Sequence, residues 1–339
     1  MNSLLALPHR PKKPRDSGLT MVLDSGLGSH GVSDLIEMAG DLADFAKLGW
    51  GTAMITKNLE KKLAMYQEAG ITPFLGGTFF ELAFLHGKVD EFSRYVEELG
   101  LGWVEISNGT VDMNADQKTD CIRELSKNFF ILSEVGGKDS DVIEAPKIWV
   151  ERIQAELEAG ARIIITEGRE SGDSGLYRRS HELRTGLVDE IVDTVSRELI
   201  LWEAPLRHQQ AWFIKRFGSN VNLGNIAPGD VLNLETLRLG LRSDTMETFH
   251  SPSAAPKTMA SPRDFLIETI ASITETNKAD IVPGAPLNQL PRFDSLAHVQ
   301  LLNELERRFS IKVTLEEELE HFKSVDSLTA YLESKVSSS

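Results

Sequence analysis

Eight short runs of β-branched, aromatic and other apolar residues recur along the first 242 residues, and a segment long enough for a helix separates most of them. The runs begin at Leu19, Phe45, Thr72, Trp103, Phe129, Arg162, Leu199 and Asn220. Strands that alternate with helical segments pair in parallel, because each crossover helix returns the chain to the end of the sheet at which the previous strand began. An open, doubly wound sheet is the alternative, but eight such units favour an α/β fold of the closed (β/α)8 TIM-barrel type.

Composition excludes several classes of protein. The 339 residues include 36 Lys and Arg against 51 Asp and Glu, a net charge of −15, so we expect no nucleic-acid binding, which needs a basic face. A single cysteine, Cys121, cannot form an internal disulfide, which is typical of a reducing, cytoplasmic setting. No apolar run approaches the roughly 20 residues of a membrane span, and the order of apolar and basic residues after Met1 predicts no signal peptide.

A change in composition divides the chain. The stretch from Ser243 to Pro262 holds three prolines and many Ser, Thr and Ala residues, and it lacks an apolar period. Such a segment is typical of a flexible tether. We therefore predict a barrel domain over residues 1–242, a flexible linker over 243–261 and a small helical domain over 262–339.

The small domain is expected to contain four helices. The second begins at Ser295, and its expected buried face consists of Leu296, Val299, Leu302, Leu305 and Phe309. An exposed serine at a helix N-terminus suits a phosphodiester, because free backbone N–H groups and the helix dipole favour an anion. Taken alone, Asp294-Ser295 also fits an ordinary helix cap.

The surrounding pattern favours the phosphodiester. From Asp264 to Val336 the segment resembles the acyl/peptidyl carrier protein family, including its Asp-Ser-Leu motif and the following acidic helix. The resemblance implies 4′-phosphopantetheine attached covalently to Ser295 by a phosphopantetheinyl transferase, and docking with carrier-dependent biosynthetic enzymes. From Pro262 onward, 8 basic and 13 acidic residues give a net charge of 8 − 13 = −5, which suits basic partners.

Charged and polar residues gather where the eight runs of the large domain end. These residues are Asp24, Lys47, Glu105, Glu134, Glu167, Arg169, Glu203 and Asn225. In (β/α)8 barrels the chemistry takes place at the carboxyl ends of the strands. Five carboxylates at one rim repel each other unless cations intervene, so a divalent metal is expected beside Lys47 and Arg169. Hard oxygen ligands without a histidine pair favour Mg²⁺, whereas a salt bridge that closes the barrel mouth is the alternative for any single residue.

These strand ends lie in ordered motifs, including DFAKLGWGT, GGTFFELA, VEISNGT, SEVGGKD, EGRESG and FGSNVNLGNIAPGD. Over Arg10 to Thr245 the chain resembles the phosphosulfolactate synthase family. The resemblance implies a magnesium-dependent carbon–sulfur lyase that adds sulfite to phosphoenolpyruvate. Its product would be (2R)-phospho-3-sulfolactate, an early intermediate in sulfonate biosynthesis toward coenzyme M. Relatives of the family include a heat-stress-associated branch, so a non-enzymatic barrel is an alternative.

The reaction assigns roles to particular residues. Sulfite addition to the methylene carbon moves charge onto the carboxylate, where a metal stabilises it, and an acid must then protonate carbon 2. Lys138 matches the family's candidate proton donor, and Lys47 is the other contender. Glu105 and Glu134 are the expected metal ligands, with Glu167 and Glu203 as alternates.

Substrate contacts are expected from a cation and from the last strand. Arg169 offers a planar fork that can grip carboxylate or phosphate. Gly218, Ser219 and Asn225 flank the last strand, where barrels often bind phosphate.

The fusion adds a second hypothesis. Coenzyme M synthesis needs no carrier, so the barrel either makes a unit for an assembly line, adds another nucleophile, or acts on a carrier-bound substrate. Barrels of this kind often self-associate, so a homo-oligomer is also expected.

Overall fold

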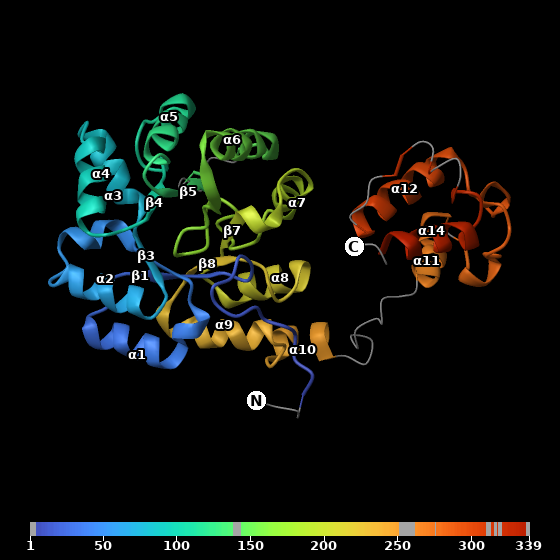
Figure 1. Cartoon of the computed structure of the whole chain (residues 1–339), viewed down its shortest axis with the longest axis horizontal. Helices are drawn as coiled ribbons and strands as arrows, with labels where there is room; N and C mark the ends of the chain where they lie inside the picture. The colour runs from blue at the N-terminus through green and yellow to red at the C-terminus, as the bar shows by residue number, and fades with distance from the viewer. Residues whose placement is uncertain are drawn as a thin grey trace. The chain divides into compact units, whose positions relative to one another are not determined.

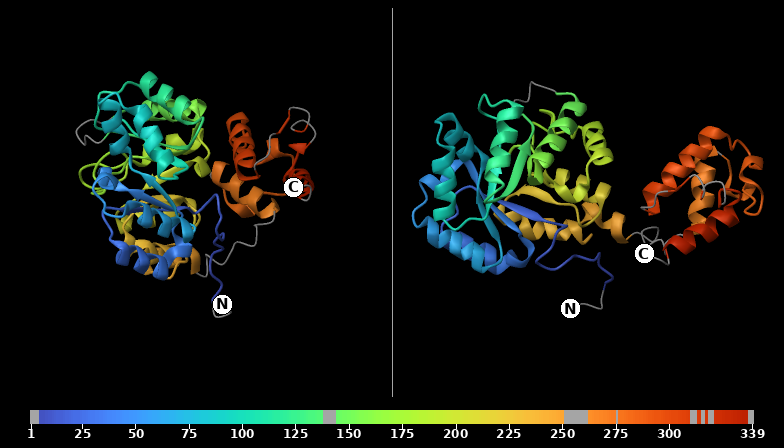
Figure 2. Two further views of the ribbon diagram at one scale, coloured as in Figure 1. Left: turned by 60° about the vertical axis from the view of Figure 1, so that its left-hand side comes forward. Right: turned by 45° about the horizontal axis from the view of Figure 1, so that its top comes forward.

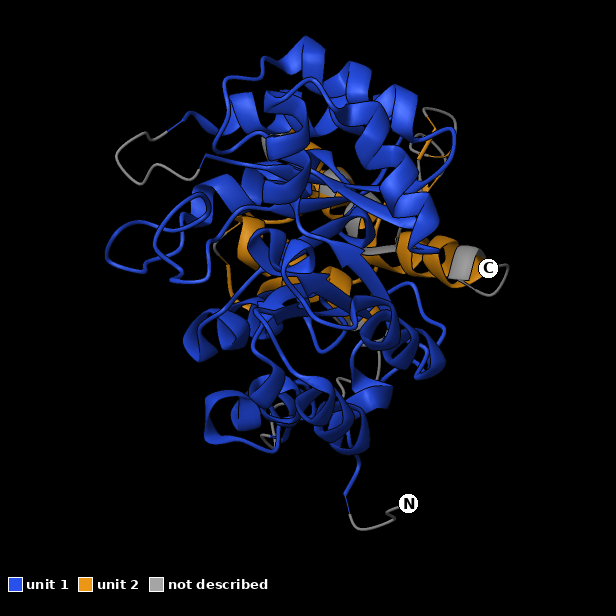
Figure 3. Ribbon diagram, turned by 90° about the vertical axis from the view of Figure 1, so that its left-hand side faces the viewer, with its two compact units in different colours: residues 1–251 blue, residues 252–339 orange. Residues whose placement is uncertain are grey.

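The computed structural model describes residues 5–137, 144–250, 262–274, 276–309, 313–314, 317 and 321–336. The chain divides into two compact units, residues 1–251 and residues 252–339 (Figure 3). No helix of the described residues is both long and apolar enough to cross a membrane.

The first unit is an eight-stranded, all-parallel sheet that curls into a nearly closed barrel. Its strands are β1 (Thr20–Asp24), β2 (Phe45–Leu48), β3 (Thr72–Leu75), β4 (Trp103–Ile106), β5 (Phe130–Val135), β6 (Ala161–Thr166), β7 (Ile200–Glu203) and β8 (Leu223–Ile226). Their order is β3-β2-β1-β8-β7-β6-β5-β4, and the end strands β3 and β4 lie against each other without a described ladder of hydrogen bonds. The predicted TIM barrel is confirmed, and each of the eight runs supplies one strand.

Helices surround the strands (Figures 1 and 2). They are α1 (Ser29–Ala39), α2 (Leu59–Glu68), α3 (Gly77–Leu85), α4 (Val89–Glu98), α5 (Ala115–Leu125), α6 (Pro146–Ala159), α7 (Thr185–Thr194), α8 (Arg207–Phe217) and α9 (Val231–Arg238). Helix α6 illustrates the sequence signals. Pro146 opens its first turn, where the missing N–H costs nothing, and Gly160 ends it with a φ of 117° that glycine adopts without steric cost.

The barrel interior has an apolar floor beneath a charged layer. The floor consists of Leu19, Met21, Phe45, Phe74, Leu132, Ile163, Ile165 and Leu201. Successive inward side chains of a strand lie two residues apart. Residues placed two positions after Phe45, Leu132 and Leu201 therefore also point inward, one layer closer to the carboxyl end. Those residues are Lys47, Glu134 and Glu203.

The N-terminal segment is anchored at the opposite, amino end of the barrel. Arg10 pairs with Glu235 at 2.9 Å, and Arg15 pairs with Asp44 at 2.8 Å. Fully buried Arg238 donates to the carbonyl oxygen of Ser219 at 2.6 Å. These contacts stabilise the end that carries no chemistry in barrels of this type.

Part of the predicted linker belongs to the barrel unit. Residues Ser243–His250 form helix α10, which packs against α8 and α9. Thr245 Oγ1 donates to the carbonyl oxygen of Leu237 at 2.6 Å, and His250 Nε2 lies 2.9 Å from that of Leu239. The linker prediction was wrong for these eight residues. The prolines that suggested a linker lie after them, and the eight residues themselves pack against the barrel. Residues 251–261 lie outside the described residues.

The second unit has a small helical core. Its long helices are α11 (Pro262–Thr274), α12 (Ser295–Phe309) and α14 (Val325–Val336). The buried core includes Leu266, Ile270, Leu301, Leu305, Leu328 and Leu332. The short acidic segment between α12 and α14, predicted to be helical, lies largely outside the described residues.

The buried face of α12 agrees only in part with the predicted one, since Leu305 is buried and Leu302 packs against the core as expected. Ala297, Leu301 and Leu305 point into the core, whereas Val299 is 51% exposed. Both choices follow a three-to-four spacing, and the position of the partner helices, which the sequence of α12 does not encode, selects between them. The side chains of Leu296 and Phe309 lie outside the described set.

Candidate active site

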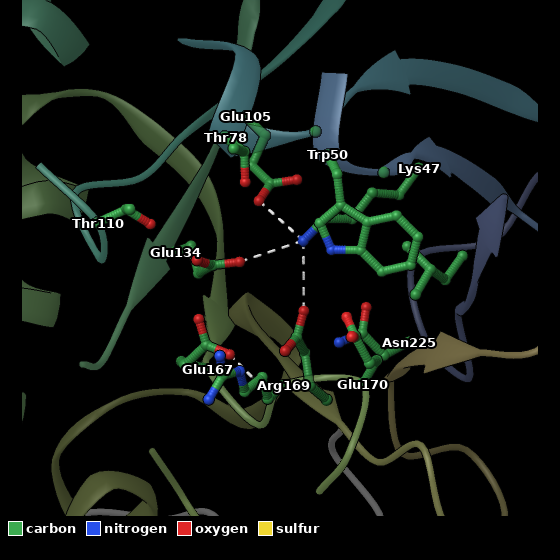
Figure 4. A pocket seen from close by; sticks show the side chains of 15 residues that line it. Lys47, Trp50, Thr78, Glu105, Thr110, Glu134, Glu167, Arg169, Glu170 and Asn225 are labelled. Atoms are coloured by element: carbon green, nitrogen blue, oxygen red, sulfur yellow. Dashed lines mark hydrogen bonds and ion pairs between the residues drawn. The ribbon is translucent and has the colours of Figure 1, made fainter. Parts of the chain in front are cut away.

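A cavity of about 250 Å³ opens at the carboxyl end of the barrel (Figure 4). Seven of the predicted residues line it: Lys47, Glu105, Glu134, Glu167, Arg169, Glu203 and Asn225. The barrel brings them together because each stands at the carboxyl end of a parallel strand or directly after one. Strands β2, β4, β5, β6, β7 and β8 all contribute.

Lys47 holds the centre of this group. Its Nζ lies 2.9 Å from Glu105 Oε1, 3.1 Å from Glu134 Oε2 and 3.4 Å from Glu203 Oε1. All four side chains are buried, with Lys47 the most exposed at 8%. Figure 4 shows Glu105 and Glu134 pointing toward the ammonium group of Lys47. We call these four residues the lysine cage.

Burial and charge act on the protonation of the cage. Burial alone lowers the pKa of Lys47, but the attraction of three carboxylates outweighs it and holds that pKa well above its usual value. Burial raises the pKa of Glu105 to about 8, with the charge of Glu134 adding to the shift and Lys47 opposing it. Burial likewise raises the pKa of Glu203. Lys47 is therefore held as a cation, while burial opposes the ionisation of Glu105.

The loop after β6 fixes the orientation of two carboxylates. The backbone N–H of Gly168 donates to Glu203 Oε2 at 2.9 Å, so the other oxygen of Glu203 faces Lys47. The N–H of Arg169 donates to Glu167 Oε1 at 2.6 Å. Further along the same loop, the hydroxyl of Tyr177 donates to the carbonyl oxygen of Glu203 at 2.7 Å.

Buried polar residues of the helices support the site from behind, and no sequence motif predicted them. Glu81 of α3 accepts hydrogen bonds from Ser107 Oγ and from the N–H groups of Gly109 and Thr110, both at 3.0 Å. These bonds fix the loop in which Thr110 lines the cavity. Glu81 stands alone among apolar residues in the motif GTFFELAFL, which was the available signal.

A second support lies behind Glu134. Lys118 pairs with Glu156 at 2.8 Å and donates to the carbonyl oxygen of Glu134 at 2.6 Å. Ser133 Oγ donates to Glu156 at 2.6 Å. Strand β5 is thus tied to α5 and α6 at the residue that enters the lysine cage.

Backbone strain also gathers at the cavity. Six non-glycine residues of the described chain have positive φ, and three of them line the cavity: Trp50 (49°), Arg169 (56°) and Asn225 (54°). This conformation is disfavoured for residues with a Cβ, above all for a bulky aromatic side chain, and such strain clusters at functional sites. The buried Oδ1 of Asn225 has no hydrogen-bond partner among the described residues.

Three sequence predictions require correction. Gly218 and Ser219 do not line the cavity, because they follow α8 and precede β8 and so lie at the amino end of the barrel. Gly218 caps α8, and the carbonyl oxygen of Ser219 accepts from Arg238. Asp24 ends β1 but turns away from the cavity, where Lys62 and Tyr66 bind it at 2.6 and 2.8 Å. Lys138 lies outside the described residues.

The site offers the donor chemistry of Mg²⁺. Glu105, Glu134, Glu167 and Glu203 carry the hard oxygens that this ion prefers. Among the described residues, however, no three His, Cys, Asp or Glu side chains form a group arranged to hold a metal ion, and Lys47 stands at the centre of the carboxylates. The residues therefore fit Mg²⁺ held by one or two carboxylates together with substrate oxygens and water, rather than an all-protein cage.

Ser295 forms a separate site on the second unit. Its side chain is exposed at the first position of α12. Asp294 caps the helix, because its Oδ1 accepts from the N–H of Ala297 at 2.9 Å. Since the aspartate supplies the cap, the serine hydroxyl is not used for capping. An open groove beside it is lined by Phe293, His298, Phe322 and Lys323, among others.

Comparisons with known proteins match both units. Residues 8–244 match the model of the (2R)-phospho-3-sulfolactate synthase family, and residues 264–332 match that of the phosphopantetheine attachment site. A phosphosulfolactate synthase of Bacillus subtilis (strain 168) is 43% identical over 244 residues, which cover 71% of this chain and 97% of the relative. A phosphosulfolactate synthase of Methanothermobacter thermautotrophicus is 41% identical over 245 residues, covering 70% and 95%.

A more distant relative is the Arabidopsis thaliana protein HEAT-STRESS-ASSOCIATED 32, which is 24% identical over 260 residues and covers 68% of this chain and 88% of its own length. The family match spans more than half of the chain and includes every residue of the lysine cage. The phosphopantetheine match includes Ser295. The chain therefore belongs to the phosphosulfolactate synthase family through its barrel, to which a phosphopantetheine carrier domain is joined.

Proposed function

We propose that the barrel adds sulfite to phosphoenolpyruvate and forms (2R)-phospho-3-sulfolactate in the cavity around the lysine cage. The observation that carries the proposal is the convergence of Glu105, Glu134 and Glu203 on Lys47, next to Arg169 at the cavity wall. The identity of 43% to a phosphosulfolactate synthase over 97% of that protein's length supports the same reaction.

The charge of the cavity supports a magnesium requirement. Five glutamates line it among the described residues, against two cations, Lys47 and Arg169. Phosphoenolpyruvate and sulfite are anions, so the cavity repels them unless a further cation enters. In this proposal Glu105 and Glu134 hold Mg²⁺. The bound ion supplies Lewis-acid stabilisation of the charge that develops on the substrate carboxylate.

Substrate binding and proton donation are assigned to residues of the chain. Arg169, exposed at the mouth, grips a carboxylate or phosphate group of the substrate as a fork of N–H donors. Lys47 keeps its proton because its pKa is raised, which suits it to orient carboxylates and suits it poorly to donate a proton. Lys138 is therefore the better candidate for the acid that protonates carbon 2.

The second unit extends this function. We propose that Ser295 carries 4′-phosphopantetheine, attached by a phosphopantetheinyl transferase, and delivers a sulfonate-derived or phosphoenolpyruvate-derived unit to biosynthetic enzymes. The exposed hydroxyl at a capped helix N-terminus supports attachment. Because the arm ends in a thiol, the proposal includes a reducing, cytoplasmic setting.

The magnesium requirement can be tested on the full chain. Consumption of phosphoenolpyruvate should depend on sulfite, stop in excess EDTA and return when Mg²⁺ is restored. Turnover that persists unchanged in EDTA would contradict the proposed role of Mg²⁺. It would not contradict the proposal that phosphoenolpyruvate accepts sulfite.

A further inference from the structure

Five exposed apolar side chains lie on the two segments that follow β2 and β3. Trp50, Met54 and Ile55 follow β2 and are 49%, 63% and 84% exposed. Leu82 and Leu85 of α3 are 46% and 64% exposed. We call these five residues the apolar rim. The 3-10 segment η2 (Gly49–Met54) packs against α3, and a Cβ added at Gly51 would lie 3.9 Å from Phe79 Cβ.

The two segments that carry the apolar rim also line the cavity. Trp50 lines the cavity from the η2 side, and Gly76, Gly77 and Thr78 line it at the start of α3. The backbone of Trp50 has a φ of 49° and a ψ of 30°. A bulky residue holds such a conformation only where its surroundings impose it, and here it directs the indole to the cavity (Figure 4).

Small anions do not account for this surface. Exposed apolar patches on soluble proteins mark binding sites, because leaving such area in water is unfavourable. Phosphoenolpyruvate and sulfite offer little apolar surface, and the cavity of about 250 Å³ holds their reacting atoms without Met54, Ile55, Leu82 or Leu85. A ligand that uses the rim must therefore have an apolar or amide-bearing part that extends out of the cavity.

We propose that the apolar rim binds the pantetheine arm of a carrier-borne substrate, whose terminal acyl group enters the cavity. The inference rests on the proposed attachment of phosphopantetheine at Ser295, because the same polypeptide then bears such an arm. Beyond its phosphate the arm contains methyl and methylene groups around two amides, a chemistry that suits exposed Ile, Met, Leu and Trp side chains.

Charge favours the same ligand. The cavity is lined by five glutamates and two cations among the described residues, so its lining opposes an anionic substrate wherever no cation offsets the charge. A carboxylate that is joined to the arm as a thioester loses its charge. A thioester-bound acceptor thus meets less repulsion in this cavity than the free acid does.

Hydrogen exchange on the full chain tests the proposal. The phosphopantetheinylated wild type is compared with the Ser295→Ala variant, which cannot carry the arm. Amides of residues 49–56 and 82–86 should exchange several-fold more slowly in the phosphopantetheinylated form. Equal exchange in the two forms would overturn the proposal.

A matched pair of surface variants separates the rim from other causes. Ile55→Ser should abolish the protection and leave turnover of free phosphoenolpyruvate with sulfite unchanged, because Ile55 does not line the cavity. Leu232→Ser is the control, since Leu232 of α9 is also exposed, at 46%, and lies outside the rim; it should keep the protection.

A second copy of the chain is the rival occupant of the rim. In that case Ile55→Ser would change the mass measured by sedimentation, and Ser295→Ala would leave the exchange unaltered, which would refute the proposal. Failure of the wild type to consume phosphoenolpyruvate and sulfite would contradict the proposed reaction alone, because the exchange experiment does not depend on turnover.

Discussion

The ammonium group of Lys47 lies 2.9 Å from Oε1 of Glu105, although the two residues stand on β2 and β4, which do not pair. The contact crosses the carboxyl end of the barrel and is almost fully removed from water. Buried charges are costly unless they are compensated, so this pair couples stability to the chemistry of the site.

Replacing the cage lysine should destabilise the barrel. Lys47→Met leaves Glu105, Glu134 and Glu203 buried without their cation, and we expect a loss of about 3–5 kcal/mol in the free energy of unfolding. Urea denaturation measures it. Lys127→Met is the control, because Lys127 pairs with Glu124 on the exposed surface and should change stability by less than about 1 kcal/mol. Equal effects of the two variants would refute the cage.

The raised pKa of Glu105 predicts a dependence of stability on pH. The folded protein keeps this proton up to a pKa of about 8, whereas the unfolded chain releases it at the ordinary, lower value. The unfolded state therefore binds fewer protons in this interval, and stability falls as the pH rises toward 8. In EDTA, the melting temperature of Glu105→Gln should decline less than that of the wild type. Parallel declines would contradict the assignment.

Arg169 should act on substrate binding rather than on folding. Arg169→Ala removes charge-assisted hydrogen bonds to the anionic substrate, and we expect kcat/KM for phosphoenolpyruvate to fall by roughly 10- to 100-fold with little change in melting temperature. Arg169→Lys should recover only part of the lost kcat/KM, because a single ammonium group lacks the planar fork of the guanidinium. Arg197→Ala, outside the cavity, serves as the control. Wild-type kinetics for Arg169→Ala would exclude this role.

Close packing at Gly77 predicts that a single methyl group disturbs the site. A Cβ at this position would collide with Ser107 and lie 2.9 Å from Glu105 Oε1. Gly77→Ala should therefore lower both activity and melting temperature. At Gly102 nothing lies within 4 Å of an added Cβ, so Gly102→Ala should be nearly neutral. A fully active Gly77→Ala enzyme would show that this contact does not shape the cavity.

Attachment of the arm can be read by mass. After incubation with coenzyme A and a phosphopantetheinyl transferase, the wild type should gain the mass of one phosphopantetheine group. Ser295→Ala should gain none, whereas Ser334→Ala in α14 should behave as the wild type. Modification of Ser295→Ala would place the arm elsewhere.

The strands could be predicted from the sequence because each has a local signal. Seven of the eight apolar runs end in charged or polar residues, and the parallel topology brings those ends to one rim. Lys47 and four of the five glutamates that line the cavity could therefore be predicted, whereas Glu170 was missed. Spacing alone is a weaker guide. Gly26, Gly28 and Gly31 after β1 show the GxGxxG spacing of dinucleotide-binding open sheets, yet here they lie in the turn from β1 and the first turn of α1 in a barrel.

The predictions that failed depend on which end of a strand a residue occupies and on contacts between elements that are distant in the sequence. Gly218 and Ser219 flank β8 in sequence, but they precede it and so lie at the wrong end. Asp24 also ends a strand, but Lys62 and Tyr66 of α2 draw it away from the cavity. The strained backbone of Trp50 and the support from Glu81 arise from packing between elements, which no local pattern encodes.

The most direct test of the account is the product formed from phosphoenolpyruvate labelled with carbon-13 at its methylene carbon. With Mg²⁺ and sulfite in heavy water, NMR should show the label in a carbon bonded to sulfur and one deuteron added at carbon 2 by the enzyme's acid. A label that remains in phosphoenolpyruvate, while the protein is folded and Mg²⁺ is present, would contradict the central claim.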